Sequence, residues 1–407
     1  MRKRSFVLGL AAAVTLAALV PVSAQLDLDR TDESVRVATF NASLNRFNQG
    51  DLITDLQNPD SAQPRAVAEI IQRTNPDVIL INEFDFDQNG VAAELFVENF
   101  LSVSQNGAEP WVPVAWFSAP SNTGIPTSID LDRDDNPEGP GDAYGFGFFP
   151  GQYGMLILSK LPIVEDEIRT FQNFLWKDMP GALLPDDPET EAPADYYSEE
   201  MLEIFRLSSK SHWDVPVMVG DTVVHILASH PTPPVFDGPE DRNGTRNHDE
   251  VRFWLDYIAM GADGYMYDDD GETGGLGEGE KFVIVGDLNL DPNDGDGMRE
   301  LGQELLANPL LTDPDQMSDG AVEDNANDAG FNETHTGNPA NDTADFGDGE
   351  FGPGNLRADY ALPSANMEVV GGGVFWPTTD DPLYALIGPD DSQTSDHRLV
   401  WVDVIVD

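Results

Sequence analysis

Short apolar runs that end or begin at Asn, Asp, Glu or His constrain the fold of this chain most. In chain order, the clearest motifs are Val37–Asn41, Ile81–Glu83, Ala228–His230, Val285–Asn289, Arg357–Tyr360 and Ser395–His397. Runs of this length and composition are typical of buried strands. Because α/β proteins place their sites at strand ends, the motifs predict a site of carboxylates, amides and imidazoles. Such side chains suit a hard cation and a phosphate ester.

The apolar pattern alternates between strand and helix periods. The strand-like runs are Val35–Phe40, Val78–Ile81, Met155–Leu158, Val223–Ala228, Phe282–Val285 and Leu399–Val406. The helix-like runs are Pro64–Thr74, Val91–Leu101, Glu250–Ile258 and Met298–Leu306. A hairpin is also expected, because Gly220 and Asp221 separate Val217–Val219 from Val223–Ala228. Helices mixed with hairpins predict a layered α/β fold with mixed sheets.

Some segments are rich in Asp, Glu, Gly, Pro or Asn and have little apolar periodicity, so we expect long surface loops there. They are Ser118–Pro150, Lys177–His212, Gly261–Glu280 and Thr312–Asn355. We expect a short lead at residues 25–34 and one domain at residues 35–407, forming a monomer.

The N-terminus has the pattern of a secretory signal peptide at residues 1–24. Basic residues 2–4 precede the apolar stretch Phe6–Val20, and Val22–Ala24 fits a small-residue cleavage site. We therefore expect a secreted, extracellular protein that begins at Gln25 and has no stable membrane insertion. The alternative is an uncleaved N-terminal anchor.

The chain is strongly acidic, with 74 Asp and Glu against 21 Lys and Arg and a formal net charge of −53. Such a field repels polyanions at low salt. At about 1 M salt the Debye length falls to roughly 3 Å, so the repulsion becomes short-ranged. We interpret the charge as adaptation of an exported protein to a salty medium, which is compatible with binding many calcium ions.

The absence of cysteine excludes disulfides and thiolate metal sites. The ligands on offer are mainly oxygen atoms, which favour Mg²⁺, Mn²⁺ or Ca²⁺ over zinc. Glu83 is the best candidate metal ligand, because a carboxylate that follows a buried run must be paired or exposed. Asn41 ends a similar run and could serve the same site or cap a helix.

Two further motifs carry candidate catalytic groups. Asp287 follows a strand-like run and could hold a metal or orient water, while the Asn289 amide could bind phosphate. Asp396 and His397 are adjacent, so on an extended chain one could face a metal and the other the substrate. His397 needs a carboxylate to set its tautomer, and Asp359 is the candidate.

A cluster of cationic residues follows His230, which itself ends an apolar run. Arg242, Arg246 and His248 precede a helix expected to begin near Glu250, with Asn247 as its N-cap. A helix N-terminus with arginines nearby can bind an anion such as phosphate. The alternative is ion pairing with surrounding acids.

A second metal site is predicted in an acidic loop. Asp130, Asp132 and Asp134 are spaced as the ligands of calcium loops are, which indicates structural calcium. Asp291, Asn293 and Asp296 have a similar pattern. Neither segment has the glutamate that completes an EF-hand loop, so a solvated acidic loop is the alternative.

Taken in order, the motifs resemble those of the endonuclease/exonuclease/phosphatase superfamily, from about Val35 to Val406. The resemblance implies a four-layer α/β sandwich, with two mixed sheets packed face to face and flanked by helices. The departure from the family pattern is the proline-rich segment Pro231–Pro234 that follows His230.

The same resemblance implies a role for each motif residue. Glu83 and Asn41 would bind a divalent cation, with Asp396 nearby. Asp287 would orient or deprotonate the attacking water, and Asn289 would hold the phosphate. His397, paired with Asp359, would stabilise the developing charge, and His230 would assist the leaving group.

The sequence therefore predicts a secreted phosphoester hydrolase that uses Mg²⁺ or Mn²⁺, with Ca²⁺ as a catalytic or structural alternative. We expect a phosphodiesterase or nuclease, acting on a phosphate ester that could be nucleic acid. The alternatives are a phosphatase or an enzyme for phospholipids or small metabolites. A different class is a non-catalytic, calcium-binding extracellular protein.

Overall fold

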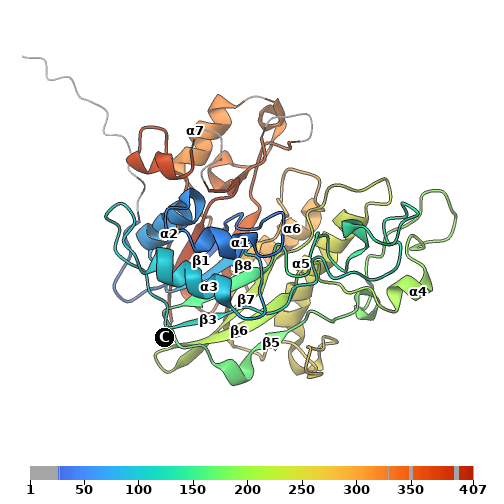
Figure 1. Ribbon diagram of the computed structural model, residues 1–407. Coiled ribbons are helices and arrows are strands. Elements are labelled where there is room, and N and C mark those ends of the chain that lie inside the picture. Colours follow the sequence, from blue (N-terminus) through green and yellow to red (C-terminus); the bar gives the residue numbers. More distant parts are fainter. Residues whose placement is uncertain (1–25, 27, 329, 348–351, 389–393, 407) are drawn as a thin grey trace, which may run out of the picture.

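A computed structural model describes residues 26, 28–328, 330–347, 352–388 and 394–406. The predicted signal peptide at residues 1–24 lies outside the described residues. Within the described part of the chain, no helix is both long and apolar enough to cross a membrane. Figure 1 shows β-strands at the centre, with helices and long loops around them.

The first sheet has 6 strands in the order β12-β13-β1-β2-β4-β3. The strands are β1 (Val35–Asn41), β2 (Val78–Asn82), β3 (Ala115–Phe117), β4 (Met155–Ser159), β12 (Glu368–Val374) and β13 (Val400–Ile405). β1 and β2 are parallel, whereas the other neighbours are antiparallel. The sheet is therefore mixed, as predicted.

The second sheet has 5 strands in the order β11-β8-β7-β6-β5. They are β5 (Arg169–Thr170), β6 (His212–Val219), β7 (Thr222–Ser229), β8 (Lys281–Asp287) and β11 (Asp359–Pro363). β7 and β8 are parallel, and β6 and β7 form the predicted hairpin. A separate two-stranded ribbon consists of β9 (Ala344–Asp345) and β10 (Asn355–Leu356).

The α-helices lie outside the two sheets or in the long insertions. They are α1 (Asp51–Leu56), α2 (Ala62–Thr74), α3 (Val91–Phe96), α4 (Glu199–Leu202), α5 (Arg242–Met260), α6 (Arg299–Ala307) and α7 (Asp319–Asn327). Apolar residues of α1, α2 and α3 join the core of the first sheet, whereas those of α5 and α6 join the core outside the second. This arrangement confirms the predicted four-layer α/β sandwich.

Alternation along β8 explains why its sequence is apolar throughout. Val283 and Val285 join the core that includes the first sheet, while Phe282 and Ile284 join the core beneath α5. Side chains alternate across a strand, so a strand buried on both faces needs apolar residues at every position. The polar residue at its end, Asp287, is then conspicuous in the sequence.

Several elements differ from the sequence prediction. α5 begins at Arg242, so Asn247 lies inside the helix and the prediction that it is the N-cap was wrong. The Asn247 side chain instead donates to the carbonyl oxygens of Thr232 and Leu288. β12 was not predicted, because its sequence contains three consecutive glycines and gives little strand signal.

The segments predicted as surface loops contribute more to the core than expected. Tyr197, Phe205 and Leu207 of the 177–212 segment are buried in the core that contains Trp176 and Phe253. The 312–355 segment holds α7 and the β9–β10 ribbon rather than loop alone. Their aromatic and apolar residues lack a regular period, so the sequence pattern did not indicate their burial.

A buried ion pair joins β1 to β13 near the start of β1 in the first sheet. The Arg36 guanidinium donates to both carboxylate oxygens of Asp403, each at 2.8 Å, and to the carbonyl oxygens of Leu28 and Thr74. Both side chains are almost fully buried. Removing either partner would leave an uncompensated charge in the core.

We expect Arg36→Ala to lower the free energy of unfolding by about 3–5 kcal/mol, because Asp403 would stay buried without its partner. Urea unfolding followed by circular dichroism measures this. The control is Asp60→Asn, since Asp60 is exposed and lies 4.0 Å from Arg65. Equal unfolding midpoints for the two variants would contradict the structural role of the buried pair.

Candidate active site

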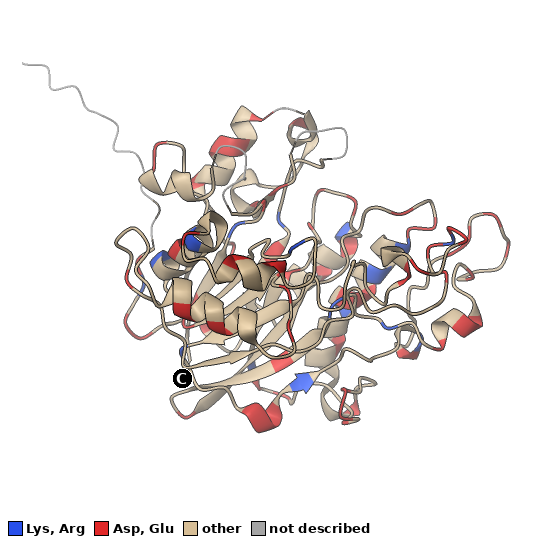
Figure 2. Cartoon of the chain, viewed as in Figure 1, with Lys and Arg blue, Asp and Glu red and all other residues tan. Residues whose placement is uncertain are grey.

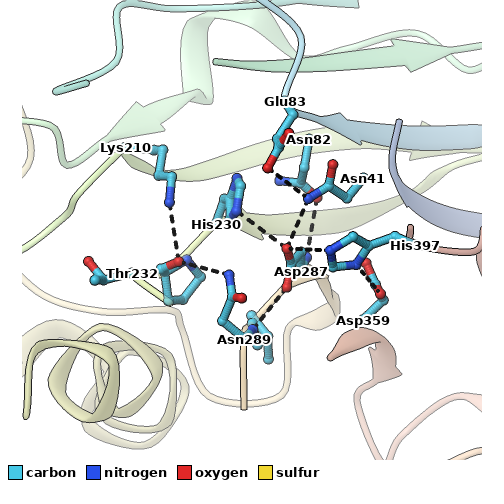
Figure 3. Close-up of polar contacts among 12 residues, drawn as sticks. Asn41, Asn82, Glu83, Lys210, His230, Thr232, Asp287, Asn289, Asp359 and His397 are labelled. Atoms are coloured by element: carbon cyan, nitrogen blue, oxygen red, sulfur yellow. Dashed lines mark hydrogen bonds and ion pairs between the residues drawn. The ribbon is translucent and has the colours of Figure 1, made fainter. Parts of the chain in front are cut away.

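The strand ends of both sheets meet at one edge of the sandwich. β1 and β2 are parallel and end at Asn41 and Asn82, and β7 and β8 are parallel and end at Ser229 and Asp287. β11 begins beside them, because Asp359 pairs with Asp287 in the antiparallel register. The predicted site residues from distant parts of the chain are thereby brought together (Figure 3).

The Asp287 carboxylate lies at the centre of this group. Its Oδ2 atom accepts a hydrogen bond from Asn41 Nδ2 at 3.0 Å and lies 3.4 Å from His230 Nε2 and 3.6 Å from His397 Nε2. Its Oδ1 atom accepts from the Asn289 backbone N–H at 3.0 Å. Burial alone would raise the pKa of Asp287, but His397, His230 and Asn41 together hold it below its usual range.

Close approach of two backbones explains the glycine before Asp287. A Cβ atom at Gly286 would lie 2.1 Å from the Ser229 carbonyl oxygen, so a larger residue would push β7 and β8 apart. The Ser229 carbonyl also accepts from Asn82 Nδ2 at 3.3 Å, and Asn82 Oδ1 accepts from the Asp287 N–H at 3.2 Å. Asn82 therefore links the two sheets directly behind the site.

His397 is held by Asp359, the carboxylate proposed from the sequence. The His397 Nδ1 atom lies 2.8 Å from Asp359 Oδ2, which also accepts from Thr343 Oγ1 at 2.9 Å. Burial would lower the pKa of His397, but the nearby Asp359 and Asp287 raise it well above its usual value. Burial raises the pKa of Asp359 to about 6, although His397 acts in the opposite direction. At neutral pH His397 is thus cationic.

His230 has a different electrostatic environment. Burial and the nearby Lys210 ammonium lower its pKa to about 4, even though Asp287 acts in the opposite direction. Its Nδ1 atom is buried and has no hydrogen-bond partner among the described residues. A neutral imidazole with Nε2–H toward Asp287 fits this arrangement. The two site histidines therefore differ in charge at neutral pH.

Glu83 is anchored by two amides in a strained backbone position. Asn41 Nδ2 and Asn45 Nδ2 donate to its two carboxylate oxygens at 3.2 and 2.6 Å. Its φ is 59°, a left-handed value that is unusual for Glu and concentrates at functional sites. Burial and the charge of Asp396 raise the pKa of Glu83. Oxygen ligands with excess negative charge suit a divalent cation.

A cavity of about 360 Å³ opens over these groups. Its polar lining consists mainly of Glu83, His230, Asp287, Asn289, Asp396 and His397, together with acidic residues of the 291–296 segment. Its apolar lining includes Pro233, Pro234, Val235 and Phe236, and Phe236 is 85% exposed. Among the described residues that line the cavity, none is Lys or Arg. The cavity thus combines an acidic floor with an apolar rim.

The cavity is not lined by the predicted anion-binding residues Arg242, Arg246 and His248. Arg246 is buried and donates to the carbonyl oxygens of Leu207, Tyr144 and Arg206. Arg242 pairs with Glu240, and His248 Nδ1 lies 3.0 Å from Asp249 Oδ1. These contacts favour the alternative of local ion pairing and loop anchoring.

Asp396 and His397 lie just before the last strand of the first sheet. β13 begins at Val400, His397 forms an isolated antiparallel bridge with Ala344, and both Asp396 and His397 line the cavity. Asp396 is exposed, whereas His397 is buried. The predicted division of roles, with one of these residues facing a metal and the other the substrate, stays a prediction.

The acidic loop remains a candidate calcium site. Asp130, Asp132 and Asp134 each offer a carboxylate oxygen within 4.8 Å of the others. The carboxylates of Asp130 and Asp132 accept backbone N–H groups from the loop itself. In the 291–296 segment, Asp291 instead accepts the N–H groups of Asn293, Asp294 and Arg357.

Lys210 was missed by the sequence analysis. It is buried beside the site, and its Nζ atom donates to the Pro231 carbonyl oxygen at 3.3 Å, an oxygen that also accepts from Asn289 Nδ2 at 3.2 Å (Figure 3). Burial lowers its pKa, while Glu250, Asp287 and Glu83 favour its charged form. The available signal was only that cations are scarce in this chain, which has 21 Lys and Arg among 407 residues.

A comparison with models of protein families identifies the family of this chain. The model of the endonuclease/exonuclease/phosphatase family matches residues 38–397. A comparison with curated proteins finds no significant match.

The solved structures to which this chain is similar are only distantly similar in sequence. An endonuclease/exonuclease/phosphatase from Beutenbergia cavernae is 18% identical, with 92% of this chain and 72% of that chain covered and a TM-score of 0.48. The human Nocturnin catalytic domain with bound sulfate is 12% identical, with 91% and 94% covered and a TM-score of 0.43. Because the family match spans most of the sequence, this chain belongs to the endonuclease/exonuclease/phosphatase family.

Proposed function

We propose that this protein is an exported, divalent-metal-dependent phosphodiesterase. The observation that carries the proposal is the convergence of Glu83, Asp287, Asn289 and His397 on one cavity, with an anionic and a cationic group side by side. The family match supports phosphoester hydrolysis as the reaction class. The N-terminal signal pattern supports export.

The residues present fit a divalent cation. Glu83 and Asp396 line the cavity and repel each other, and Asn41 donates to Glu83, so Glu83, Asp396 and Asn41 would hold the ion. When bound, Mg²⁺ or Mn²⁺ neutralises the phosphate charge and polarises the phosphorus–oxygen bond. Ca²⁺ is an alternative with the same preference for oxygen ligands.

Each of the remaining polar groups in the cavity has a separate role in the proposed hydrolysis. Asp287 is ionised and can orient a water molecule and accept its proton. Asn289 can turn its amide toward a phosphate oxygen, and cationic His397 can stabilise the charge that develops on phosphorus oxygens. His230 is neutral, so it can donate a hydrogen bond to the leaving oxygen but is a weak source of a full proton at neutral pH.

The cavity wall favours a diester that carries an apolar or small organic group. Pro233, Pro234, Val235 and Phe236 offer an apolar rim, and the described lining has no Lys or Arg to neutralise a run of phosphates. Tight nonspecific nucleic-acid binding relies on such cations. A nuclease is the second candidate, favoured in high salt because screening weakens the repulsion between chain and polyanion.

Substrate assays test the reaction class. We expect hydrolysis of bis-p-nitrophenyl phosphate to exceed that of p-nitrophenyl phosphate. We also expect cleavage of plasmid DNA to increase from low to multimolar salt, because the Debye length shortens and the repulsion between the acidic chain and DNA weakens. Rates would be measured with Mg²⁺, Mn²⁺ and Ca²⁺ on the chain that begins at Gln25. Absence of hydrolysis under every condition would rule out the proposed phosphoesterase activity.

Glu83→Gln should reduce metal-dependent kcat/KM by about 100-fold or more, because it removes an anionic ligand while keeping the side-chain shape. A matched control is Asp221→Asn, an exposed acid in the β6–β7 turn. Titration with Mg²⁺ and Mn²⁺ separates weaker binding from slower chemistry. Wild-type activity in Glu83→Gln would show that Glu83 is not a ligand of the catalytic cation.

Asp359→Asn should shift the alkaline limb of the pH profile of kcat/KM to lower pH. The Asp359 carboxylate favours protonated His397, so its removal lowers the pKa of His397 and the cation is lost earlier as pH rises. The control is Asp214→Asn, which removes the carboxylate beside His225. An unchanged alkaline limb in Asp359→Asn would show that His397 charge does not set activity.

A further inference from the structure

A second cluster of acids lies in the segment that precedes β11. Asp324 is on α7, Asp328 directly follows this helix, and Asp345 is on β9. Their carboxylates each offer an oxygen within 4.8 Å of the other two. Like charges this close repel one another, and either a bound cation or protonation of a carboxylate relieves this repulsion.

Asn355 is an independent observation that points to a ligand. The side chain is fully buried, and its Nδ2 atom donates to Asp324 Oδ2 at 2.9 Å, so the amide reaches into the cluster. Its Oδ1 atom has no hydrogen-bond partner among the residues that the structure describes. A buried amide oxygen without a partner is costly, and a cation would satisfy it.

The β9–β10 register places these groups on one face. Asn355 lies directly opposite Asp345 in this antiparallel pair, so their side chains project from the same side of the ribbon. The Asn355 backbone N–H is held by Asn332 Oδ1 at 2.7 Å, which fixes the position of the ribbon relative to the preceding segment. The four oxygen-bearing side chains thus come from three separate stretches of the chain.

We propose that Asp324, Asp328, Asp345 and Asn355 bind a calcium ion that is distinct from the catalytic ion. Carboxylates and an amide carbonyl are typical Ca²⁺ ligands, and Ca²⁺ tolerates irregular sets of six to eight oxygens better than Mg²⁺ does. Arg398 is a cation whose charge acts on Asp324, and it also stacks on Trp376 and donates to the Ser395 carbonyl oxygen. One guanidinium leaves the group of carboxylates with excess negative charge.

The ion would fix the ribbon against the active site. Ala344 forms a backbone bridge with His397, and the Asp345 N–H donates to the Asp396 carbonyl oxygen at 2.8 Å. The Phe346 ring packs edge-on against the His397 imidazole, with ring centroids 5.2 Å apart. Calcium at this place would therefore position His397 and Asp396 without touching the substrate.

The test measures calcium binding directly and does not depend on activity. Protein stripped with EDTA, in the Glu83→Gln background, would be titrated with Ca²⁺ alone by calorimetry. We expect Asp345→Asn and Asp324→Asn each to lose about one equivalent of bound calcium, together with the calcium-dependent rise in Tm. The matched control is Asp132→Asn in the other acidic loop, which should retain this equivalent.

Asn355 variants separate ligand loss from misfolding. Asn355→Asp keeps an oxygen ligand and should bind Ca²⁺ at least as tightly, whereas Asn355→Leu should bind at least about tenfold more weakly. Circular dichroism checks that both variants fold. Equal calcium stoichiometry and affinity in wild type, Asp345→Asn and Asn355→Leu would overturn the proposal. Tighter binding of Mg²⁺ than Ca²⁺ at this site would overturn its assignment to calcium.

Discussion

The buried carboxylate of Asp287 is the constraint on which the rest of the site depends. Its removal from water is costly, so the fold must supply donors and positive charge around it. Asn41 comes from the first sheet, His230 follows a neighbouring strand, and His397 precedes the last strand. The same contacts that stabilise this charge join the two sheets. The geometry of the site therefore depends on how the two sheets pack.

Two imidazoles that face the same carboxylate differ in charge because their other neighbours differ. His397 has Asp359 behind it, which outweighs the cost of burial and keeps the ring cationic. His230 has Lys210 nearby and an unpartnered Nδ1 atom, so burial prevails and the ring is neutral. Separate environments thereby supply an electrostatic group and a hydrogen-bond donor within one small cavity.

Acidic residues are distributed along many of the helices and loops, with few basic residues among them (Figure 2). Several of the basic residues are buried and form contacts inside the protein. Arg36 pairs with Asp403 in the core, and Arg246 gathers three backbone carbonyl groups from neighbouring loops. The acidic insertions also contribute to the core, because Tyr197 and Phe205 of the 177–212 segment are buried there. Scarce cations and buried aromatics therefore hold the long segments to the sandwich.

The sequence by itself determined the buried strands and the polar residues at their ends. Uninterrupted apolar runs such as Phe282–Val285 indicate burial on both faces, and Asp287 stands out beyond them. The pairing of Asp359 with His397 could also be proposed, because an imidazole in such a site needs a carboxylate to set its tautomer. Only the tertiary structure decided the start of α5, the burial of Lys210 and the contact of Asp324, Asp345 and Asn355. Local periodicity carries no information about these features, since they arise from residues that are far apart in the chain and meet only when the layers pack.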